Sequence, residues 1–477
     1  MLTSYQPFVD GAPVTAAGGT FTTRNPADGE VIAEVGRGVG TDVDAAVRSA
    51  ERARLGWART RPAERGRILL RLAEVLRANA DELARLETLD NGQALVQSRG
   101  DVETAARYFE FFGGAADKLH GETIPLGPDY LSYTVNEPFG VIGFVLPWNA
   151  PLQQAARGLA PALAAGNVGV VKPAEDTPLT TLELARLAVE AGLPSGVLNV
   201  VPGYGHEAGA ALVEHPGVRK IAFTGSVDTG SLIARTAADR LVPVTLELGG
   251  KSPNIVFPDA DLDAVARSSW IGFTLKSGQV CSAGTRLLIH TDVYDDVVAR
   301  LVTRAAAATL GPGLENPDLG PLATAAQFEK VTGYLKLGVE EGATVAAGGG
   351  VPDDAALRAG HFVQPTIFTE VDNTMRIAQE EIFGPVLCAI RFTDDDEAVR
   401  IANDTRYGLA AGVWTTDLSR AHRVAGQLES GQVFVNEYFA GGVETPFGGF
   451  KSSGYGREKG FEALKHYTQT KTVTVRV

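Results

Sequence analysis

Between residues 141 and 257 the chain alternates short, almost wholly apolar runs with helical stretches. The apolar runs are VIGFVL (141–146), VGVV (168–171), VLNVV (197–201), KIAF (220–223) and NIVF (254–257). Strands that are apolar on both faces are typical of a parallel sheet covered by helices on both sides. This alternation predicts an α/β fold.

The α/β pattern continues from roughly 260 to 445, where VLCAIRF (386–392) and GQVFVN (431–436) are predicted strands. Near the N-terminus, Asp10-Gly11 lies between two short β-prone runs and predicts a hairpin turn. We found no internal repeat and no low-complexity segment.

Two helices are predicted from apolar spacing and capping residues. Leucines at spacings of three, four and seven predict one helix over residues 62–90, stopped by Asn91-Gly92. Thr177 is expected to cap a second helix, with Pro178 at its first helical position.

Two segments alternate polar and apolar residues, the pattern of half-exposed strands: YLSYTVN (130–136) and KTVTVRV (471–477). A long bare terminal strand invites uncontrolled pairing. We therefore expect the two segments to pair in an antiparallel flap that docks on another subunit.

Composition excludes several classes of protein. The 477 residues include 43 Lys and Arg against 57 Asp and Glu, a net charge of −14 without basic runs, which argues against a nucleic-acid surface. No apolar run approaches the roughly 18 residues that a membrane span needs, and the first residues do not resemble a secretory signal. Two cysteines are too few for a disulfide framework. These features predict a soluble, cytoplasmic protein.

The two cysteines differ in their surroundings. Cys388 lies among apolar residues of a predicted strand, which is typical of an inert buried thiol. Cys281 lies in the small-residue stretch KSGQVCSAGTR, where a ligand can approach the backbone closely. A nucleophilic thiol needs a base or a lowered pKa, and Glu247, at the end of an apolar strand, is the candidate base. Considered alone, a cysteine such as Cys281 is more often inert, and a glutamate such as Glu247 is more often a solvated surface group.

Eight motifs that follow one another along the chain outweigh the interpretation of Cys281 and Glu247 as residues without a catalytic role. They are EPFGVIGFVLPWNAP, VVKPAEDTP, IAFTGSVDTG, VTLELGGKSPNIV, GQVCSAGTR, EEIFGPV, NDTRYGLAAGVWT and PFGGFKSSGYGREKG. Together they resemble the aldehyde dehydrogenase superfamily of NAD(P)-dependent enzymes, from about Pro7 to the last strand. The resemblance implies a Rossmann-type cofactor domain (1–117 and 139–249), an α/β catalytic domain (250–452) and a small β oligomerisation domain (118–138 and 453–477). It also implies a homodimer or homotetramer.

The resemblance assigns three catalytic roles. Cys281 matches the nucleophile, which adds to an aldehyde to give a thiohemiacetal and then a thioester. Asn149 matches the side chain that, with the backbone N–H of Cys281, holds the developing oxyanion. Glu247 matches the general base that activates first the thiol and then water.

The expected cofactor is NAD, with NADP possible, and no metal is expected. No G-x-G-x-x-G follows a strand; a Phe-Thr-Gly-Ser turn stands in its place. Glu175 is expected to accept a hydrogen bond from the adenosine ribose, which favours NAD. The cofactor-binding residues implied by the resemblance are Trp148, Lys172, Glu175, Gly205, Phe223, Gly225, Ser226, Leu248, Glu381 and Phe383.

Arg157 bears on the substrate. Relatives acting on succinic semialdehyde or some hydroxylated aromatic aldehydes have Arg at this position, where its guanidinium could hold a carboxylate or phenolate. With Gln154 and Phe447 it predicts a polar, acidic (semialdehyde) or hydroxyaromatic aldehyde. Ser282 departs from the pattern of semialdehyde-specific relatives. The alternative for Arg157 is a contact with a subunit interface or a structural carboxylate.

Three rival functions remain at this point. An acylating dehydrogenase would pass the thioester to CoA or phosphate, but such relatives commonly lack the carboxylate at Glu247. A non-catalytic descendant would be expected to have lost the thiol, the carboxylate or the amide, and all three are present. A thiol hydrolase would need a histidine base, and no His lies in a comparable stretch.

Overall fold

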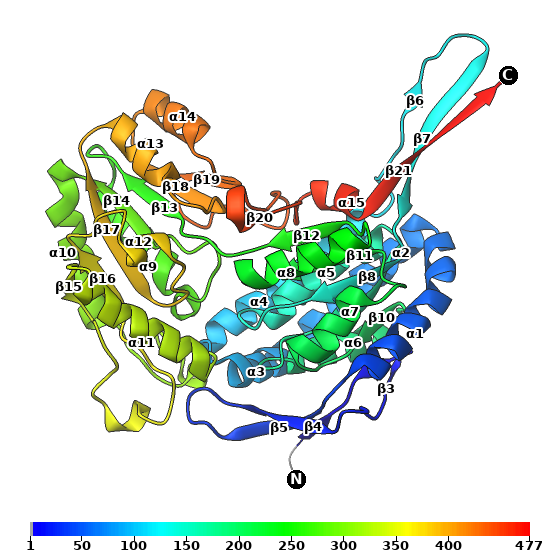
Figure 1. The fold of residues 1–477 in the computed structure, drawn as a ribbon, viewed down its shortest axis with the longest axis horizontal. Helices are drawn as coiled ribbons and strands as arrows, with labels where there is room; N and C mark the ends of the chain where they lie inside the picture. Colours follow the sequence, from blue (N-terminus) through cyan, green and yellow to red (C-terminus); the bar gives the residue numbers. More distant parts are fainter. Residues whose placement is uncertain (1–2) are drawn as a thin grey trace.

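Two large β-sheets flanked by helices form the body of the molecule, and two three-stranded sheets lie at its periphery (Figure 1). This computed structural model describes residues 3–477. The arrangement confirms the predicted α/β fold. No helix within the described residues is long and apolar enough to cross a membrane.

The first large sheet contains the predicted strands between 141 and 224. In spatial order its strands are β20 (Gly454–Tyr455), β12 (Val244–Glu247), β11 (Lys220–Thr224), β8 (Val141–Val145), β9 (Val168–Lys172), β10 (Leu198–Val200), β2 (Phe8–Val9) and β3 (Ala12–Pro13). The five strands from β12 to β10 are parallel, as their apolar composition predicts. Both edges are antiparallel. Asp10 and Gly11, both with positive φ, form the predicted hairpin turn between β2 and β3.

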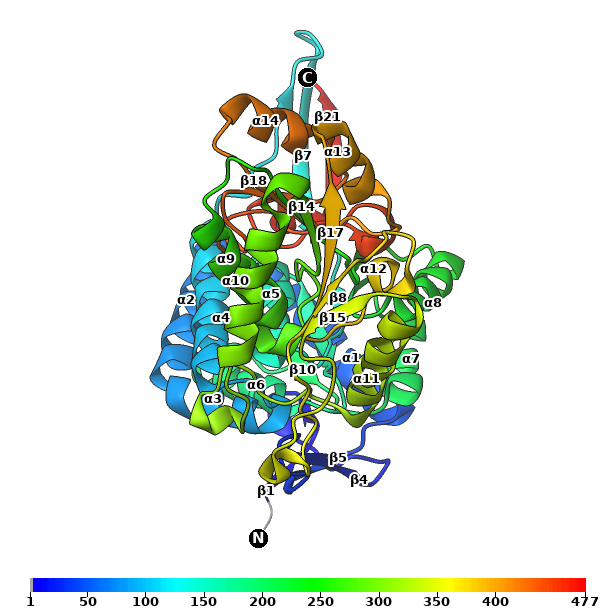
Figure 2. The same cartoon turned by 90° about the vertical axis from the view of Figure 1, so that its left-hand side faces the viewer.

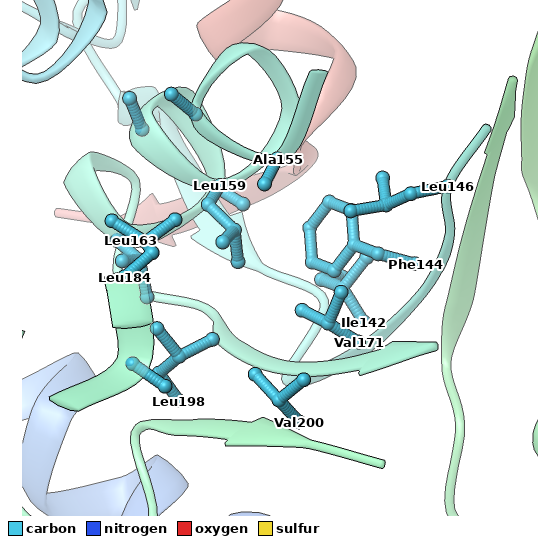
Figure 3. Close-up of a cluster of buried hydrophobic side chains, with 14 of the residues drawn as sticks. Ile142, Phe144, Leu146, Ala155, Leu159, Leu163, Val171, Leu184, Leu198 and Val200 are labelled. Atoms are coloured by element: carbon cyan, nitrogen blue, oxygen red, sulfur yellow. The ribbon is translucent and has the colours of Figure 1, made fainter. Parts of the chain in front are cut away.

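Helices cover both faces of this sheet. Those on one face are α5 (Pro151–Ala164) and α6 (Leu179–Glu190), and those on the other are α1 (Gly40–Arg59) and α7 (Ala210–Glu214). Figure 3 shows Phe144 of β8 directed toward Leu159 of α5. Each such buried side chain contributes about 1.5–3 kcal/mol relative to an exposed one. The loop between β8 and α5, which carries Asn149, is therefore anchored at both ends in the core.

Two helix predictions are wrong in detail. The helix expected over residues 62–90 is two helices, α2 (Pro62–Ala78) and α3 (Ala80–Asn91). The side-chain amide of Asn79 donates to the carbonyl of Val75 (2.8 Å), so it competes with the helical backbone and ends α2. Gly92, with φ of 88°, ends α3 as expected.

Thr177 does not cap α6. The helix begins at Leu179, and Pro178 stands at the capping position without a side-chain hydrogen bond. The hydroxyl of Thr177 instead donates to the carbonyl of Trp148 (3.3 Å), while the carboxylate of Asp90 accepts from the backbone N–H of Leu179 (3.1 Å). A distant carboxylate therefore takes the role that the sequence suggested for Thr177.

The second large sheet has seven strands. In spatial order they are β15 (Thr344–Ala347), β16 (Thr366–Thr369), β17 (Val386–Phe392), β14 (Arg286–His290), β13 (Pro253–Val256), β18 (Ala410–Trp414) and β19 (Gln432–Val435). All neighbours are parallel except β15 and β16. The helices of this part are α9 (Leu262–Thr274), α10 (Tyr294–Ala307), α11 (Ala325–Glu340), α12 (Arg376–Gln379), α13 (Asp395–Asn403) and α14 (Leu418–Gln427).

A β-flap projects from the body, as Figures 1 and 2 show. It consists of β6 (Thr123–Ile124), β7 (Tyr130–Pro138) and β21 (Thr468–Arg476). The antiparallel pairing of β7 with β21 confirms the predicted pairing; docking on another subunit stays a prediction. Of the expected oligomerisation segment 453–477, β20 lies in the first large sheet, and α15 (Glu462–His466) packs near α5.

Candidate active site

Cys281 lies where two cavities meet. Both cavities are lined by Asn149, Gln154 and Cys281. The first also includes these predicted cofactor residues: Trp148, Gly225, Ser226, Glu381 and Phe383. The second includes the predicted substrate residues Arg157 and Phe447. The thiol is therefore open to two different ligands at once.

A strained turn precedes the thiol. Lys276 and Ser277 adopt positive φ values of 53° and 55°, and Gly278 follows with φ of 75°. A Cβ atom on Gly278 would lie 2.1 Å from the carbonyl oxygen of Gly384, so only glycine fits there. The turn therefore fixes the path of the backbone that leads into Cys281.

Burial raises the pKa of the Cys281 thiol to about 11. The positive charge of Arg157 opposes this rise, whereas Glu247 and Glu381 add to it. The thiol is therefore protonated at neutral pH, and it needs a base before it can act as a nucleophile.

Alkylation of Cys281 by iodoacetamide should accordingly accelerate with pH. Because only the thiolate reacts and its pKa lies near 11, the rate should rise about 100-fold between pH 7 and pH 9. Mass spectrometry of the labelled cofactor-free protein measures this rate. Cys281→Ala should remain unlabelled, since the Cys388 side chain is fully buried. A rate that is constant over this range would show that the thiolate already exists at pH 7.

Glu247 is the last residue of β12 and is almost completely buried. Neither of its carboxylate oxygens has a hydrogen-bond partner within residues 3–477. Burial raises the pKa of Glu247 well above its ordinary value, and the nearby carboxylate of Glu458 raises it further. A carboxylate without partners and with a raised pKa is suited to accept a proton from a ligand.

Asn149 is oriented by the loop that carries Cys281. Its side-chain amide donates to the carbonyl oxygen of Gln279 (2.9 Å). The side chain of Gln279 is fixed in turn, since it donates to the carbonyl of Lys276 (3.0 Å) and accepts from the N–H of Ala323 (2.9 Å). One N–H of Asn149 thus holds the amide in place while the side chain lines both cavities. Sequence reasoning did not identify Gln279.

The Phe-Thr-Gly-Ser turn opens helix α8 (Val227–Asp239). Ser226 caps this helix by accepting from the N–H of Thr229 (3.3 Å). The N–H of Gly225 donates to the carbonyl of Glu247 (3.1 Å), so the turn is tied to the candidate base. Phe223 and Leu248 are buried beneath the turn, with Leu248 against Gly230 at the start of α8.

Lys172 and Glu175 form an ion pair at the end of β9, with 2.5 Å between nitrogen and oxygen. Burial pushes the pKa of Glu175 upward, but the charge of Lys172 and hydrogen bonds, one of them from the N–H of Gly205, bring the pKa below its ordinary value. The structure therefore brings these three predicted residues together. They do not line the cavity beside Cys281.

Glu381 and Phe383 lie on the loop between α12 and β17. The carboxylate of Glu381 accepts from the N–H of Gly250 (3.0 Å) and faces the first cavity. The ring of Phe383 packs edge-on against Trp148, with 5.3 Å between ring centroids. The two residues and the turn that carries Ser226 therefore line the same cavity.

Arg157 forms an ion pair with Glu458, and both side chains are almost fully buried. Its guanidinium also donates to the hydroxyl of Thr224 (3.3 Å) and lies 5.2 Å from the ring centroid of Phe447. This pairing favours the structural-carboxylate alternative for Arg157. Glu458 belongs to the motif PFGGFKSSGYGREKG, but nothing in that motif indicates which cation it pairs with.

Arg157→Leu should destabilise the protein markedly. Removing one partner of a buried ion pair typically costs about 3–5 kcal/mol, because the remaining charge stays buried without compensation. In differential scanning fluorimetry, the double variant Arg157→Leu/Glu458→Leu should show at most half of the decrease in melting temperature that Arg157→Leu causes. If the single variant melts within about 2 °C of wild type, the pair contributes little to stability.

Comparison with known proteins identifies the family. The family model described as "Aldehyde dehydrogenase family" matches residues 14–473. A betaine aldehyde dehydrogenase of Brucella melitensis is 47% identical over 473 residues, which are 98% of this chain and 97% of the relative. A mitochondrial aldehyde dehydrogenase of Rattus norvegicus is 47% identical over 464 residues, covering 96% of this chain and 89% of the relative.

The fold agrees with these sequence matches. A solved NAD+ complex of an aldehyde dehydrogenase from Bacillus cereus superposes with a TM-score of 0.97 at 44% identity, covering 99% of this chain and 96% of that one. The match over nearly the whole chain also confirms the resemblance drawn from the eight motifs. The chain belongs to the aldehyde dehydrogenase family.

Proposed function

We propose that this protein oxidises a polar aldehyde to the carboxylic acid with NAD+, through a thioester on Cys281. The observation that carries the proposal is the convergence of Cys281, Glu247 and Asn149 where two cavities meet. One cavity then takes the cofactor and the other the aldehyde.

The residues of the first cavity, together with the Lys172–Glu175 pair outside it, fit a dinucleotide. The carboxylates of Glu175 and Glu381 can accept hydrogen bonds from the two ribose rings, and the N–H groups at the start of α8 can bind the pyrophosphate. Trp148 and Phe383 provide apolar walls for the nicotinamide ring. NAD+, when bound, accepts the hydride that the aldehyde carbon loses. The negative charge of Glu175 would repel a 2′-phosphate, which favours NAD over NADP.

The chain's own residues carry the remaining steps. Glu247 takes the proton of the Cys281 thiol, and the sulfur adds to the carbonyl carbon. The side-chain amide of Asn149 and the backbone N–H of Cys281 hold the developing oxyanion, and one such donor typically lowers the barrier by about 2.7–4 kcal/mol. After oxidation to the thioester, Glu247 removes a proton from water. The hydroxide attacks the thioester carbon and releases the acid and the free thiol.

The second cavity supports a polar substrate. Polar side chains along it are Gln97, Thr104, Tyr108, Gln153, Gln154 and Gln432. We therefore retain a polar, acidic (semialdehyde) or hydroxyaromatic aldehyde as the substrate class. An acylating reaction remains the alternative, and the buried Glu247 argues against it because transfer to CoA or phosphate needs no water-activating base.

We also propose that the protein forms a homodimer or homotetramer and that it lies in the cytoplasm. The exposed edge of β21 and the apolar side chains Leu131 and Val475 on the flap support a homodimer or homotetramer. The low cysteine content is compatible with the cytoplasm.

A reduction assay tests the proposed function. Purified protein is incubated with NAD+ or NADP+ and with aliphatic, aromatic and acidic aldehydes, with and without CoA or phosphate, and absorbance at 340 nm is followed. We expect activity with polar aldehydes that prefers NAD+ and is independent of CoA and phosphate. Absence of activity with every aldehyde, or an absolute requirement for CoA or phosphate, would contradict the proposal.

A further inference from the structure

Most charged side chains around the second cavity are neutralised by a neighbour. Arg157 pairs with Glu458, and Lys276 pairs with Asp101 (2.5 Å). Glu444, three residues after the lining residue Gly441, pairs with Arg107. These pairs leave little net charge for a ligand to recognise.

Lys459 is the exception. It lines the second cavity and forms no salt bridge or hydrogen bond through its side chain within the described part of the chain. Its ammonium lies 5.5 Å from the ring centroid of Phe447, and the guanidinium of Arg157 lies 5.2 Å from the same ring. The cavity therefore holds a partly buried cation without a counter-ion.

The backbone at Lys459 is also unusual. Its φ of 61° lies in the left-handed region, and Gly460 follows with φ of 57°. Glycine adopts this conformation most easily, so a lysine at position 459 is strained relative to glycine. Strain at a side chain that faces a cavity is a feature of functional sites.

The charge of Lys459 is available near neutral pH. Burial lowers its pKa to about 8, and the neighbouring Arg157 lowers it as well, whereas Glu444, Cys281 and Glu247 raise it. A carboxylate is fully ionised at pH 7, whereas an ordinary phenol, with a pKa near 10, is neutral. The ammonium of Lys459 therefore matches a carboxylate better than a phenol.

We propose that Lys459 selects the substrate by pairing with a carboxylate at the far end of the aldehyde. This inference rests on the proposed function and narrows it to oxo acids, whose aldehyde group reaches Cys281 while the carboxylate pairs with the Lys459 ammonium in the second cavity. Lys459 thus takes the role that the sequence suggested for Arg157, whose charge Glu458 already neutralises.

Matched substrate pairs test the proposal. The pairs are 4-carboxybenzaldehyde with 4-isopropylbenzaldehyde, and 4-oxobutanoate with 4-methylpentanal; within each pair a carboxylate is replaced by a neutral group of similar shape. The phenol 4-hydroxybenzaldehyde is measured beside them. The readout is the ratio of kcat/KM for the acidic member to kcat/KM for the neutral member. Wild type should favour the acidic member in at least one pair, and Lys459→Met should lower that ratio about tenfold or more.

Two further variants control for structure. Lys459→Arg keeps the charge and should retain most of the ratio. Lys465→Met removes a lysine that is exposed on α15 and pairs with Glu462, and it should leave the ratio at the wild-type value. Melting temperatures of all variants show that they are folded.

Any of four outcomes would overturn the proposal. Equal ratios in wild type and Lys459→Met, or a wild type that prefers the neutral member or 4-hydroxybenzaldehyde, contradict the role of Lys459 but leave aldehyde oxidation intact. A wild type that oxidises none of these aldehydes contradicts both this inference and the proposed function.

Discussion

Cys281→Ala will lose aldehyde oxidation, with kcat/KM lowered by more than about 10⁴-fold. The aldehyde carbon must become tetrahedral before it can lose hydride, and the thiol is the nucleophile at the junction of the two cavities. Absorbance at 340 nm over a range of aldehyde concentrations that includes values below KM measures this loss. Binding of NAD+, followed by isothermal titration calorimetry, should be retained, because the expected cofactor contacts lie on other residues.

Cys388 provides the matched control. Cys388 lies on β17 with its side chain fully buried, its thiol donates to the carbonyl of Ile377 (3.2 Å), and it lines neither of the two cavities. Cys388→Ala should keep wild-type turnover. If Cys281→Ala oxidises aldehydes within tenfold of wild type, or if Cys388→Ala loses activity instead, the assignment of the nucleophile is wrong.

Glu247→Gln should lower kcat by about 10²–10⁴-fold, the usual contribution of a general base. The amide has nearly the same shape but cannot take a proton from the thiol or from water. The pKa of Glu247 is raised by burial and by Glu458. Because the ionised form is the active base, wild-type kcat should fall as the pH drops through this raised pKa, and the variant should lose this dependence.

Rapid-mixing absorbance separates the two steps that Glu247 serves. A burst of one NADH per active site followed by slow turnover would place the main defect in hydrolysis of the thioester. A slow first turnover without a burst would place it in activation of the thiol. A kcat within tenfold of wild type and an unchanged pH profile would remove Glu247 from the mechanism.

Periodicity and apolar runs predicted the strands well because burial on both faces leaves a direct trace in composition. The runs at 141–146, 168–171 and 220–223 all became parallel strands of the first sheet. The predicted helix boundaries were wrong at two polar side chains, one with a local hydrogen bond and one with a tertiary hydrogen bond. Asn79 bonds to its own helix, whereas Thr177 bonds to the carbonyl of Trp148.

The motifs located the candidate site, but they could not give its electrostatics. Arg157 looked like a free cation in the sequence, and its partner Glu458 comes from a segment far along the chain. The charge of a cavity depends on such long-range pairs. For the same reason, the sequence could not show that Lys459, next to Glu458, lines the second cavity without a salt-bridge partner.

The strand that carries Glu247 is paired along one edge by residues that come about 200 positions later in the sequence. Among residues 3–477, the strand that pairs with its outer edge is β20, where Gly454 pairs with Glu247, and the N–H of Leu248 donates to the carbonyl of Ser453 (3.0 Å). A ribosome-bound nascent chain that ends before this segment has the thiol and the carboxylate but no finished pocket around them. The backbone on either side of Glu247 is therefore fully hydrogen-bonded only when residues 453–455 are in place.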